Sequence, residues 1–387
     1  MRILCLGAGP AGLYFAIAAA LQHRGHHITV LEQDPPSATY GWGVTFGENL
    51  LDLLFDVDPT SAAAVQSAAA LWQERELRLY GRRAAHFPGY GFGISRATLL
   101  EILSRRAVDL GVEVRHGSPI HDLGAIADAD LLVGADGARS MVRETHREHF
   151  GTRIEEAANT YVWLGSDRRF AHFTFALERT PGGHIWMHGY PYAEDRSTVV
   201  VECSPATRDA LGLDSAVGVA VLEQLFAETL GGAGLLAQSR AETVRWQRFD
   251  LVQNETTVYR HTVLLGDAAS TMHFSLGRGT RLALADAVLL AGCLSHHHDV
   301  SAALAVYDRR RRGAPHHDQG RAQRSMTWYE RMDSHATLSP PAFANAMSGG
   351  PPRAGLRDRL VQTKPIRRMY RRADARALAA GMAARNR

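Results

Sequence analysis

Cysteine and long hydrophobic runs are both scarce in this chain of 387 residues. The three cysteines, Cys5, Cys203 and Cys293, are far apart and odd in number. Their placement argues against a disulfide framework or a zinc site and fits a reducing compartment. Apolar stretches such as 282–294 are too short or too interrupted to span a bilayer. We therefore expect no stable membrane association.

A large excess of charge of one sign is also missing. The formal net charge of +3 is too weak to indicate binding of nucleic acid. No signal peptide precedes the first predicted strand, which begins almost at Met1, so a cytoplasmic location is expected. The histidine run 296–298 has no second ligand cluster beside it, so we expect a surface loop there and no metal site.

The N-terminal residues carry a strand, a glycine turn and a helix in succession. An apolar run over 3–6 predicts a buried strand, and 13–22 has the pattern of a helix. Glycines spaced G-x-G-x-x-G between them let the backbone and the helix N-terminus approach a pyrophosphate. A second strand over 28–31 ends about twenty residues later, where a carboxylate meets a ribose hydroxyl. The residues predicted to bind a dinucleotide here are Gly7, Gly9, Pro10, Ala11, Gly12, Glu32 and Gln33.

Three further segments have both a functional and an ordinary structural interpretation. Trp42, between two glycines, either helps to hold a flat ligand or packs in the core beside an ordinary loop. Arg96, in the first turn of a helix over 96–110 that Ser95 caps, either has an anionic partner or faces solvent. Asp136 and Gly137 end a strand at the edge where α/β sheets bind ligands, or they form a simple turn.

The second half of the chain changes in texture. From 161 to 203, strands alternate with turns, which predicts an antiparallel sheet whose aromatic residues form either one wall of a pocket or plain core. A buried strand over 262–265 then leads to Asp267 and to a glycine-bearing loop, and a long helix follows to 294. Helices are also expected over 61–73 and 217–230. The arginine-rich region after 307 reads as a solvated helical appendage, or as a tail that binds phosphate.

Three motifs in this order resemble the single-component FAD-dependent aromatic hydroxylases, the group that includes para-hydroxybenzoate hydroxylase. They are Gly7-x-Gly9-x-x-Gly12 with Glu32, Asp136-Gly137-x-x-Ser140-x-x-Arg143, and Gly266-Asp267-Ala268-Ala269. Segments 41–44, 161–165, 201–203 and 273–280 resemble the branch that contains salicyloyl-CoA 5-hydroxylase, anthraniloyl-CoA monooxygenase and the indole hydroxylase of violacein biosynthesis. The resemblance extends to about Tyr329. One departure is Ser270, where the broader family has His.

The resemblance implies an α/β fold. A Rossmann-like FAD-binding domain over 1–75, 92–155 and 245–313 would be interleaved with an antiparallel-sheet substrate domain over 76–91 and 156–244. C-terminal helices and a basic tail would occupy 314–387.

The resemblance also implies roles for individual residues. Gly7, Gly9 and Gly12 would bind the FAD pyrophosphate and Glu32 the adenosine ribose. Asp267 would bind the ribityl or pyrophosphate region. The remaining cofactor residues would be Trp42, Gly43, Val44, Arg96, Asp136, Gly137, Gly266, Gly277, Gly279 and Thr280. His273 is the expected catalytic side chain, as a polar contact or a proton carrier, although a packed, non-catalytic histidine is the alternative. The expected substrate pocket comprises Phe175, Trp186, His188, Tyr190 and Phe274.

The implied activity is hydroxylation of an electron-rich aromatic or indole ring. NADPH or NADH would reduce the flavin transiently, and O2 would then give a flavin C4a-hydroperoxide. Two substrate kinds stay open: a CoA or carrier-protein thioester, and an indole-bearing compound. We expect a monomer or a homodimer. The rival interpretations are other flavin chemistry, such as halogenation, dehydrogenation or oxidative cyclisation, and a non-catalytic binding protein. The Trp-x-Trp-x-Ile segment of flavin halogenases is absent, because Trp246 is followed by Gln247 and Arg248.

Overall fold

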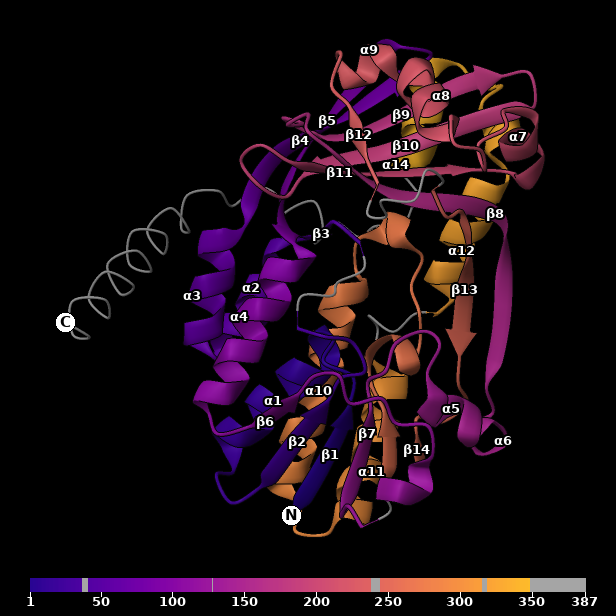
Figure 1. Ribbon diagram of the computed structural model, residues 1–387. Coiled ribbons are helices and arrows are strands. Elements are labelled where there is room, and N and C mark those ends of the chain that lie inside the picture. The colour runs from indigo at the N-terminus through magenta and orange to yellow at the C-terminus, as the bar shows by residue number, and fades with distance from the viewer. Residues whose placement is uncertain (37–40, 127, 238–243, 315–318, 349–387) are drawn as a thin grey trace, which may run out of the picture.

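Two sheets with helices on their faces make up the chain. The computed structural model describes residues 1–36, 41–126, 128–237, 244–314 and 319–348. In Figure 1 the sheet that contains β1 lies in the lower half of the molecule and the sheet that contains β10 in the upper half. The predicted α/β fold with two interleaved sheets is confirmed. None of the helices in the described ranges is long and apolar enough to cross a membrane.

The lower sheet has six strands in the order β14-β15-β7-β1-β2-β6. Neighbouring strands are parallel, except for β14 and β15, which pair antiparallel. Because parallel strands all end at one edge, the loops after β1, β2 and β7 meet there. The strands are β1 (Arg2–Leu6), β2 (His27–Leu31), β6 (Glu113–Arg115), β7 (Leu131–Gly134), β14 (Val258–Tyr259) and β15 (Thr262–Leu264).

Helices on both faces of the lower sheet bury its apolar side chains. Tyr14, Leu103, Leu290 and Tyr307 share one core with the strands, so α1, α4, α10 and α11 cover the same face. Short elements around Val142 and Phe150 cover the other face. The helices are α1 (Pro10–Gln22), α2 (Glu48–Val57), α3 (Pro59–Ala68), α4 (Arg96–Asp109), α5 (Met141–Thr145), α6 (Arg147–Phe150), α10 (Gly279–His296) and α11 (Val300–Gly313), with 3-10 turns η1 (Leu123–Ile126) and η2 (Gly266–Ala268).

The upper sheet has nine strands in the order β12-β8-β11-β10-β9-β4-β5-β3, with β13 also paired to β8. Neighbours are antiparallel except β4 and β9. The strands are β3 (Gly43–Phe46), β4 (Ala70–Leu79), β5 (Arg82–Ser95), β8 (Arg153–Ser166), β9 (Phe173–Thr180), β10 (Gly183–Pro191), β11 (Ser197–Cys203), β12 (Leu235–Leu236) and β13 (Gln247–Gln253).

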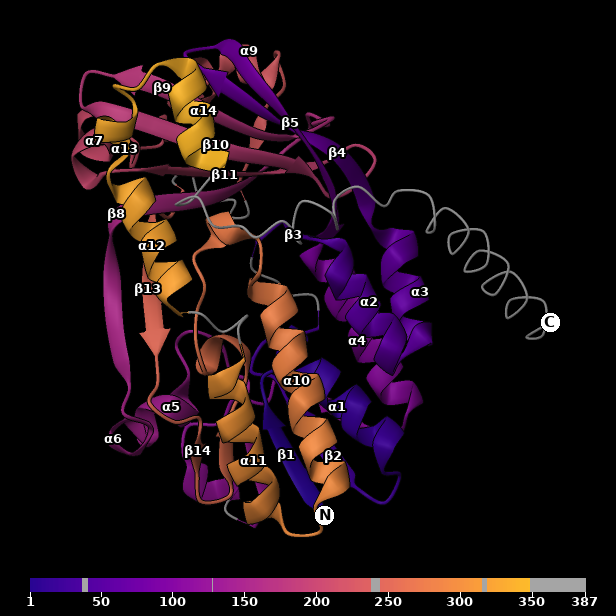
Figure 2. The ribbon, with the colours of Figure 1, turned by 180° about the vertical axis from the view of Figure 1, so that it is seen from behind.

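Alternation along β10 assigns side chains to the two faces of the upper sheet. Ile185 and Met187 pack into one core with Leu222 and Phe226, below α8 and α9. Trp186 faces the opposite side, where C-terminal helices cover the sheet, as Figure 2 shows from behind. The elements of these two layers are α7 (Pro205–Ala210), α8 (Gly218–Leu225), α9 (Ala227–Leu230), η3 (Phe274–Leu276), α12 (Gln319–Glu330), α13 (Met332–His335) and α14 (Pro340–Ser348).

Two expected helices are wrong in extent. The helix expected over 61–73 ends at Ala68, and β4 begins at Ala70, because pairing with β5 satisfies the backbone there. The helix expected over 217–230 is broken at Phe226 into α8 and α9. The domain boundaries given above stay a prediction. The upper sheet also includes 43–46, 70–75 and 92–95, which that division assigns to the FAD-binding domain. Residues 349–387, with most of the expected basic tail, lie outside the described residues.

Candidate functional site

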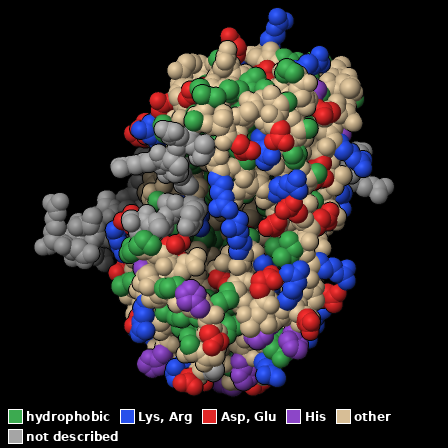
Figure 3. All heavy atoms as spheres, turned by 45° about the vertical axis from the view of Figure 1, so that its right-hand side comes forward, with side chains coloured by type: hydrophobic (Ala, Val, Ile, Leu, Met, Phe, Trp, Pro, Cys, Tyr) green, Lys and Arg blue, Asp and Glu red, His purple; other side chains and the backbone are tan. Residues whose placement is uncertain are grey.

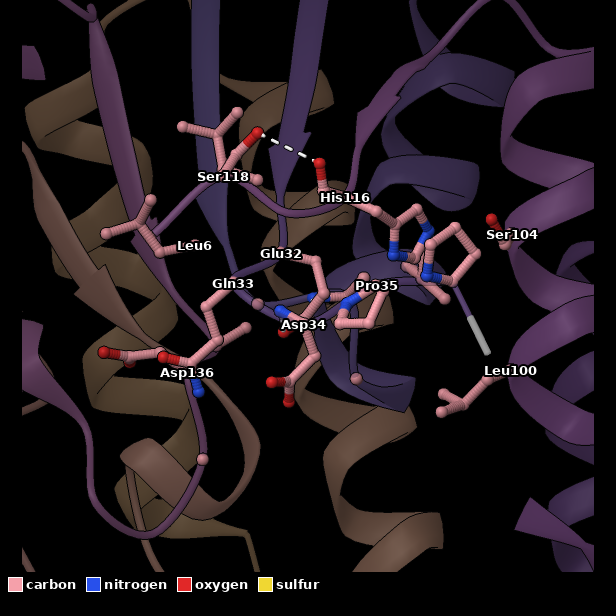
Figure 4. Close-up of a pocket in the computed structure, with 18 of the residues that line it drawn as sticks. Leu6, Glu32, Gln33, Asp34, Pro35, Leu100, Ser104, His116, Ser118 and Asp136 are labelled. Carbon is pink, nitrogen blue, oxygen red and sulfur yellow. Dashed lines mark hydrogen bonds between the residues drawn. The ribbon is translucent and has the colours of Figure 1, made fainter. Parts of the chain in front are cut away.

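A cavity of about 760 Å³ opens at the carboxyl edge of the lower sheet. The loops after β1, β2 and β7 line it, together with one side of α4. Figure 4 shows Glu32, Gln33 and Asp136 around this cavity, with Leu100 and Ser104 on the opposite wall. A volume of this size is in the range of clefts that enclose cofactors. The predicted cofactor residues that line it are Gly7, Gly9, Glu32, Gln33, Arg96, Asp136 and Gly137.

The first glycine loop is held by close backbone contacts. Gly7 has φ +101, and a Cβ there would lie 2.3 Å from the carbonyl oxygen of Ala135. A Cβ on Gly12 would lie 2.1 Å from the carbonyl oxygen of Gly7. At Gly9, by contrast, the nearest atom to such a Cβ would be 4.0 Å away, so space is open beside this backbone. Close packing therefore requires glycine at Gly7 and Gly12, whereas Gly9 lies beside space that a ligand can occupy.

The N-terminus of α1 meets the cavity without a side-chain cap. Its N-cap residue is Gly9, and Pro10 stands in the first turn. The backbone N–H groups of that turn therefore have no side-chain acceptor and can bind an anion.

Glu32 binds the loops on both sides of it. One carboxylate oxygen accepts from the backbone N–H of Ala8 at 2.8 Å, and the other accepts from that of Asp34 at 3.1 Å. The carboxylate thus fixes the glycine loop as well as facing the cavity.

Asp136 carries an unpaired buried oxygen. Its Oδ2 accepts from the N–H groups of Met141 at 2.7 Å and Val142 at 3.2 Å, whereas its buried Oδ1 has no partner among the described residues. Burial raises the pKa of this carboxyl despite the hydrogen bonds. Gly137 follows with φ +80, so the chain turns sharply here. A buried acceptor at the wall of a cavity points to a donor that a ligand or water supplies.

The third loop packs directly on the other two. A Cβ on Gly266 would lie 2.9 Å from the Cβ of Ala11. The buried guanidinium of Arg143 donates to the carbonyl oxygens of Ala138 and Ala268, at 2.6 and 3.3 Å. The three loops that the motifs predict therefore converge at one place.

Asp267 itself does not line the cavity of Figure 4, but Arg96 links it to that cavity. Arg96 lines the cavity and lies close enough to Asp267 and Glu32 for both carboxylates to raise its pKa against the larger, opposite effect of burial. Asp267 is solvent-exposed in this structure. The loss of hydration among the neighbouring protein atoms nevertheless raises its pKa, and the attraction of Arg96 opposes this effect.

The loop before α10 runs beside β3. Gly277 has φ +57, and a Cβ there would lie 3.3 Å from Cγ2 of Thr45. Gly279 is the first residue of α10, Thr280 follows it, and a Cβ on Gly279 would have no atom within 4 Å. The helix N-terminus has no side-chain cap. Figure 3 shows a hollow in the middle of the molecule, with Lys or Arg side chains at its rim.

Residues 42–44 join the lower half to the upper sheet. The carbonyl oxygen of Gly43 accepts from the hydroxyls of Tyr190 at 2.8 Å and Thr198 at 3.1 Å. The ring of Trp42 covers Gly165, where a Cβ would come within 2.6 Å of it. The indole Nε1 of Trp42 is buried and has no partner in the described ranges. The segment thus has a packing role, and one donor is left for a ligand. Val44 pairs with Ile94 in β3.

Most of the predicted substrate residues gather on one face of the upper sheet. His188 lies 5.2 Å from Phe175 and 6.1 Å from Phe274, between ring centroids. Trp186 is two residues along the same strand and therefore on the same face. Tyr190 lies farther along that face, where it stacks on Phe173 at 5.5 Å.

Tyr329, which sequence reasoning missed, completes this cluster from α12. Its ring centroid lies 5.5 Å from that of His188, 5.7 Å from His273 and 6.1 Å from Trp186. Tyr329 is more than 50 residues from every one of these neighbours, so no local spacing could have indicated the contact.

His273 lies beside a buried carboxyl group. Its Nδ1 is 2.7 Å from Oγ of Ser275, and its Nε2 is 3.9 Å from Oε1 of Glu202. Glu202 accepts from Asn159 at 2.9 Å and from the indole N–H of Trp186 at 3.2 Å. The sequence did offer a signal for Glu202, which is the single charged residue of the otherwise uncharged strand β11. All seven residues of that strand are buried.

Burial shifts the titration of this cluster strongly. It raises the pKa of Glu202 to about 8, against the hydrogen bonds from Asn159 and Trp186. It lowers the pKa of His273 to about 3 and that of His188 to about 4. Both imidazoles are therefore neutral at pH 7, and the carboxyl group is largely protonated.

The described part of the chain contains a single group of three side chains that could share a metal ion. Glu74, His86 and His172 bring ligand atoms within 4.8 Å of one another. Two of the three already contact each other, because Oε2 of Glu74 is 3.4 Å from Nδ1 of His86. The third has a backbone partner, since Nδ1 of His172 is 2.7 Å from the carbonyl oxygen of Gln73. These contacts account for the group without an ion, and the expectation of no metal site stays a prediction.

Comparison with known proteins decides the family. The family model described as "FAD binding domain" matches residues 121–317. A 3-hydroxy-4-methyl-anthranilyl-[aryl-carrier protein] 5-monooxygenase of Streptosporangium sibiricum is 40% identical over 333 residues, which cover 86% of this chain and 90% of that protein. The chain belongs to the FAD-dependent aromatic monooxygenases.

Other members of this family are also similar to this chain. Salicyloyl-CoA 5-hydroxylase of a Streptomyces species is 33% identical, with 89% of this chain and 68% of that protein covered. Protodeoxyviolaceinate monooxygenase of Chromobacterium violaceum is 28% identical, with 89% and 93% covered. The structure of tetrameric 2-methyl-3-hydroxypyridine-5-carboxylic acid oxygenase has a TM-score of 0.72 at 20% identity, with 89% and 95% covered, and shows the same fold.

The residues of the cleft fit FAD, the cofactor of the monooxygenase. Open space beside Gly9 and an uncapped helix N-terminus suit a pyrophosphate. The unpartnered Oδ1 of Asp136 and the carboxylate of Glu32 suit hydroxyl donors of a ribose or a ribityl chain. The second uncapped helix N-terminus, at Gly279, suits the electron-rich edge of a flavin.

Proposed function

We propose that this monooxygenase hydroxylates an amino- or hydroxybenzoyl group that is bound as a thioester to CoA or to a carrier protein. The supporting observation is the 40% identity to a monooxygenase of a hydroxy-methyl-anthranilyl carrier protein over 90% of its length. Salicyloyl-CoA 5-hydroxylase, which is 33% identical, has the same kind of substrate by name. NADPH or NADH is the proposed reductant and O2 the oxidant.

For the cofactor, we assign the pyrophosphate to the glycine loop and the first turn of α1, and the adenosine ribose to Glu32 and Gln33. Arg96, Asp136 and Asp267 take the phosphates and the ribityl chain. The N-terminus of α10 and the segment at Trp42 would hold the edge of the flavin ring. Bound FAD carries electrons from the nicotinamide cofactor and activates O2. The residues assigned to the cofactor are the eighteen named above from Gly7 to Thr280, including Gly137, Gly266, Gly277 and Gly279.

On the substrate side, the protein orients the ring and excludes water. Phe175, Phe274 and Tyr329 contact His188 in edge-to-face geometry, and we assign to these rings the aromatic neighbours of the substrate ring. We assign a polar contact with the substrate to His273, whose neutral Nε2 can accept a hydrogen bond while its Nδ1 stays bonded to Ser275. Oε1 of Glu202 lies 3.9 Å from this Nε2, and because that carboxyl group is largely protonated at pH 7 it supplies a polar neighbour and no ionic partner.

The test is NADPH consumption and product formation across a substrate panel. The panel contains the N-acetylcysteamine thioesters of anthranilate and salicylate, the two free acids, and tryptophan-derived indoles. We expect the thioesters to stimulate NADPH oxidation at least tenfold more than the acids and to yield a product heavier by one oxygen. Stimulation by the free acids alone would contradict the proposal.

An indole-bearing substrate is the second candidate. Its support is the 28% identity to protodeoxyviolaceinate monooxygenase over 93% of that protein. In the same panel, oxygen insertion into an indole with no response to either thioester would favour it. A protein that stays colourless after reconstitution with FAD would contradict both candidates.

A further inference from the structure

The imidazole of His188 is buried without a hydrogen-bond partner on either nitrogen. The residue is 3% exposed, and neither Nδ1 nor Nε2 has a partner within the described ranges. A neutral imidazole has one donor and one acceptor, and burying both unpaired destabilises the fold. Native proteins avoid this cost unless water or a ligand satisfies the group.

The position of His188 favours a ligand. Its four ring neighbours, Phe173, Phe175, Phe274 and Tyr329, are uncharged and lie between 5.2 and 6.1 Å from it. The imidazole is therefore buried among aromatic rings, and of these four rings only that of Tyr329 carries a polar atom.

Two indoles nearby show the same deficiency. In the sheet, Val200 pairs with both His188 and Trp163, so the two rings stand in one row across three strands. Val162 and Leu164 point into the opposite core, which places Trp163 on the face of His188. The indole Nε1 atoms of Trp163 and of Trp42, which covers Gly165 on this same strand, are buried and unpartnered in the described part of the chain. Unsatisfied donors thus gather on one side of the sheet.

We infer that His188 is the residue that recognises the amino or hydroxyl substituent of the substrate ring, and that the pocket selects rings whose carboxyl group is masked. The imidazole offers one donor and one acceptor, which match an uncharged amino or hydroxyl group. A free carboxylate would lose its hydration among uncharged rings. The inference rests on the proposed function and specifies its substrate class.

The test compares binding of three probes to the FAD-loaded enzyme by quenching of tryptophan fluorescence. Anthranilamide carries the amino group and a masked carboxyl, benzamide lacks the amino group, and anthranilate has the free carboxylate. In the wild type we expect anthranilamide to bind at least tenfold more tightly than either of the others. In His188→Phe, which keeps an aromatic ring and removes both nitrogens, the ratio of anthranilamide to benzamide affinity should fall to about one.

A second readout separates recognition from packing. Because His188→Phe removes two unpaired buried atoms, its melting temperature should be equal to or above that of the wild type. His184→Phe is the matched control on the same strand: Nδ1 of His184 is 2.6 Å from Asp333, outside the ring cluster. It should leave the affinity ratio unchanged.

Three outcomes would overturn the inference: an affinity ratio that survives in His188→Phe, equal binding of anthranilamide and benzamide by the wild type, or tight binding of anthranilate. Binding does not depend on turnover. If the affinities follow our expectation while no thioester is hydroxylated, the proposed function fails and the recognition role of His188 stands.

Discussion

At the scale of single residues, the candidate site contains carboxyl groups in unlike environments. Glu32 is held by two backbone N–H groups, Asp136 keeps one oxygen unpaired, Asp267 is exposed beside Arg96, and Glu202 is buried beside His273. Each environment predicts a different response to substitution.

Replacing Asp267 should weaken the binding of FAD. Asp267→Ala removes the carboxylate that raises the pKa of Arg96 and that we assign to the ribityl chain. We expect the ratio of absorbance at 450 nm to that at 280 nm after gel filtration to fall by at least half. Asp209→Ala, an exposed acidic residue on α7, is the control. A variant that stays fully yellow would exclude the assigned role.

Replacing Glu202 should change how stability depends on pH. Burial raises the pKa of Glu202 to about 8, so between about pH 4.5 and 8 the folded protein holds a proton that the unfolded chain has released. This contribution is complete below pH 4.5 and is lost as the pH rises through 8. Relative to Glu202→Gln, the wild type should lose about 1.4 kcal/mol of unfolding free energy per pH unit across that window.

Urea unfolding of both proteins at pH 5, 7 and 9 measures this difference. Glu101→Gln, an exposed carboxyl on α4, is the control for the loss of a charge. Parallel stability curves for the wild type and Glu202→Gln would show that Glu202 is ionised in the fold at neutral pH.

At the scale of elements, the glycines of the predicted cofactor loops differ in how closely they are packed. Gly7→Ala would place a Cβ 2.3 Å from a backbone oxygen at a positive φ, and Gly279→Ala would meet no atom. We expect the first variant to lose at least about 2 kcal/mol of stability or to fail to fold. The second should be as stable as the wild type, because alanine favours the helix, but should bind FAD more weakly. Denaturant titration with and without FAD measures both effects, and equal stability of the two variants would contradict them.

The pairing of α10 and α11 gives a second prediction at this scale. The buried Arg311 donates to Asp286 on α10 at 3.0 Å and to Ser270, in the loop after Asp267, at 2.7 Å. Arg311→Met leaves Asp286 as a buried carboxylate without this ion pair, and we expect a loss of about 3–5 kcal/mol in urea unfolding. The double variant with Asp286→Leu should recover most of it. A loss below 1 kcal/mol in the single variant would contradict this account.

Elements differ in how far the sequence could predict them. The N-cap at Ser95 depends on Thr98, three residues away, and was predictable. The turn at Gly7 was predictable from the glycine spacing, whereas its close contact with the carbonyl oxygen of Ala135 was not. The segment 70–73 has helical spacing, yet it forms a strand because β5 lies beside it. The contacts of Tyr329 and the bond from Asn159 to Glu202 join distant segments, so a sequence pattern gives no information about them.

At the scale of the whole molecule, the proposed FAD site combines three loops from different parts of the chain. A ligand that binds only this arrangement stabilises the fold, by about 2.7 kcal/mol at a concentration one hundred times its Kd. We expect the melting temperature of the apoprotein to rise by several degrees as FAD is added, and not with riboflavin at equal concentration. A melting temperature that is independent of FAD would contradict a preformed dinucleotide site.

The order of the strands constrains protein engineering. Apart from its edge strand β3, the upper sheet draws on two separate stretches, 70–95 and 153–253, and between them the chain returns to build α4, β6 and β7 of the lower sheet. A chimera in which a relative supplies both of these stretches must therefore be joined at four points in the sequence rather than two. The Gly43 carbonyl, which receives the hydroxyls of Tyr190 and Thr198, must find the same two donors in the graft.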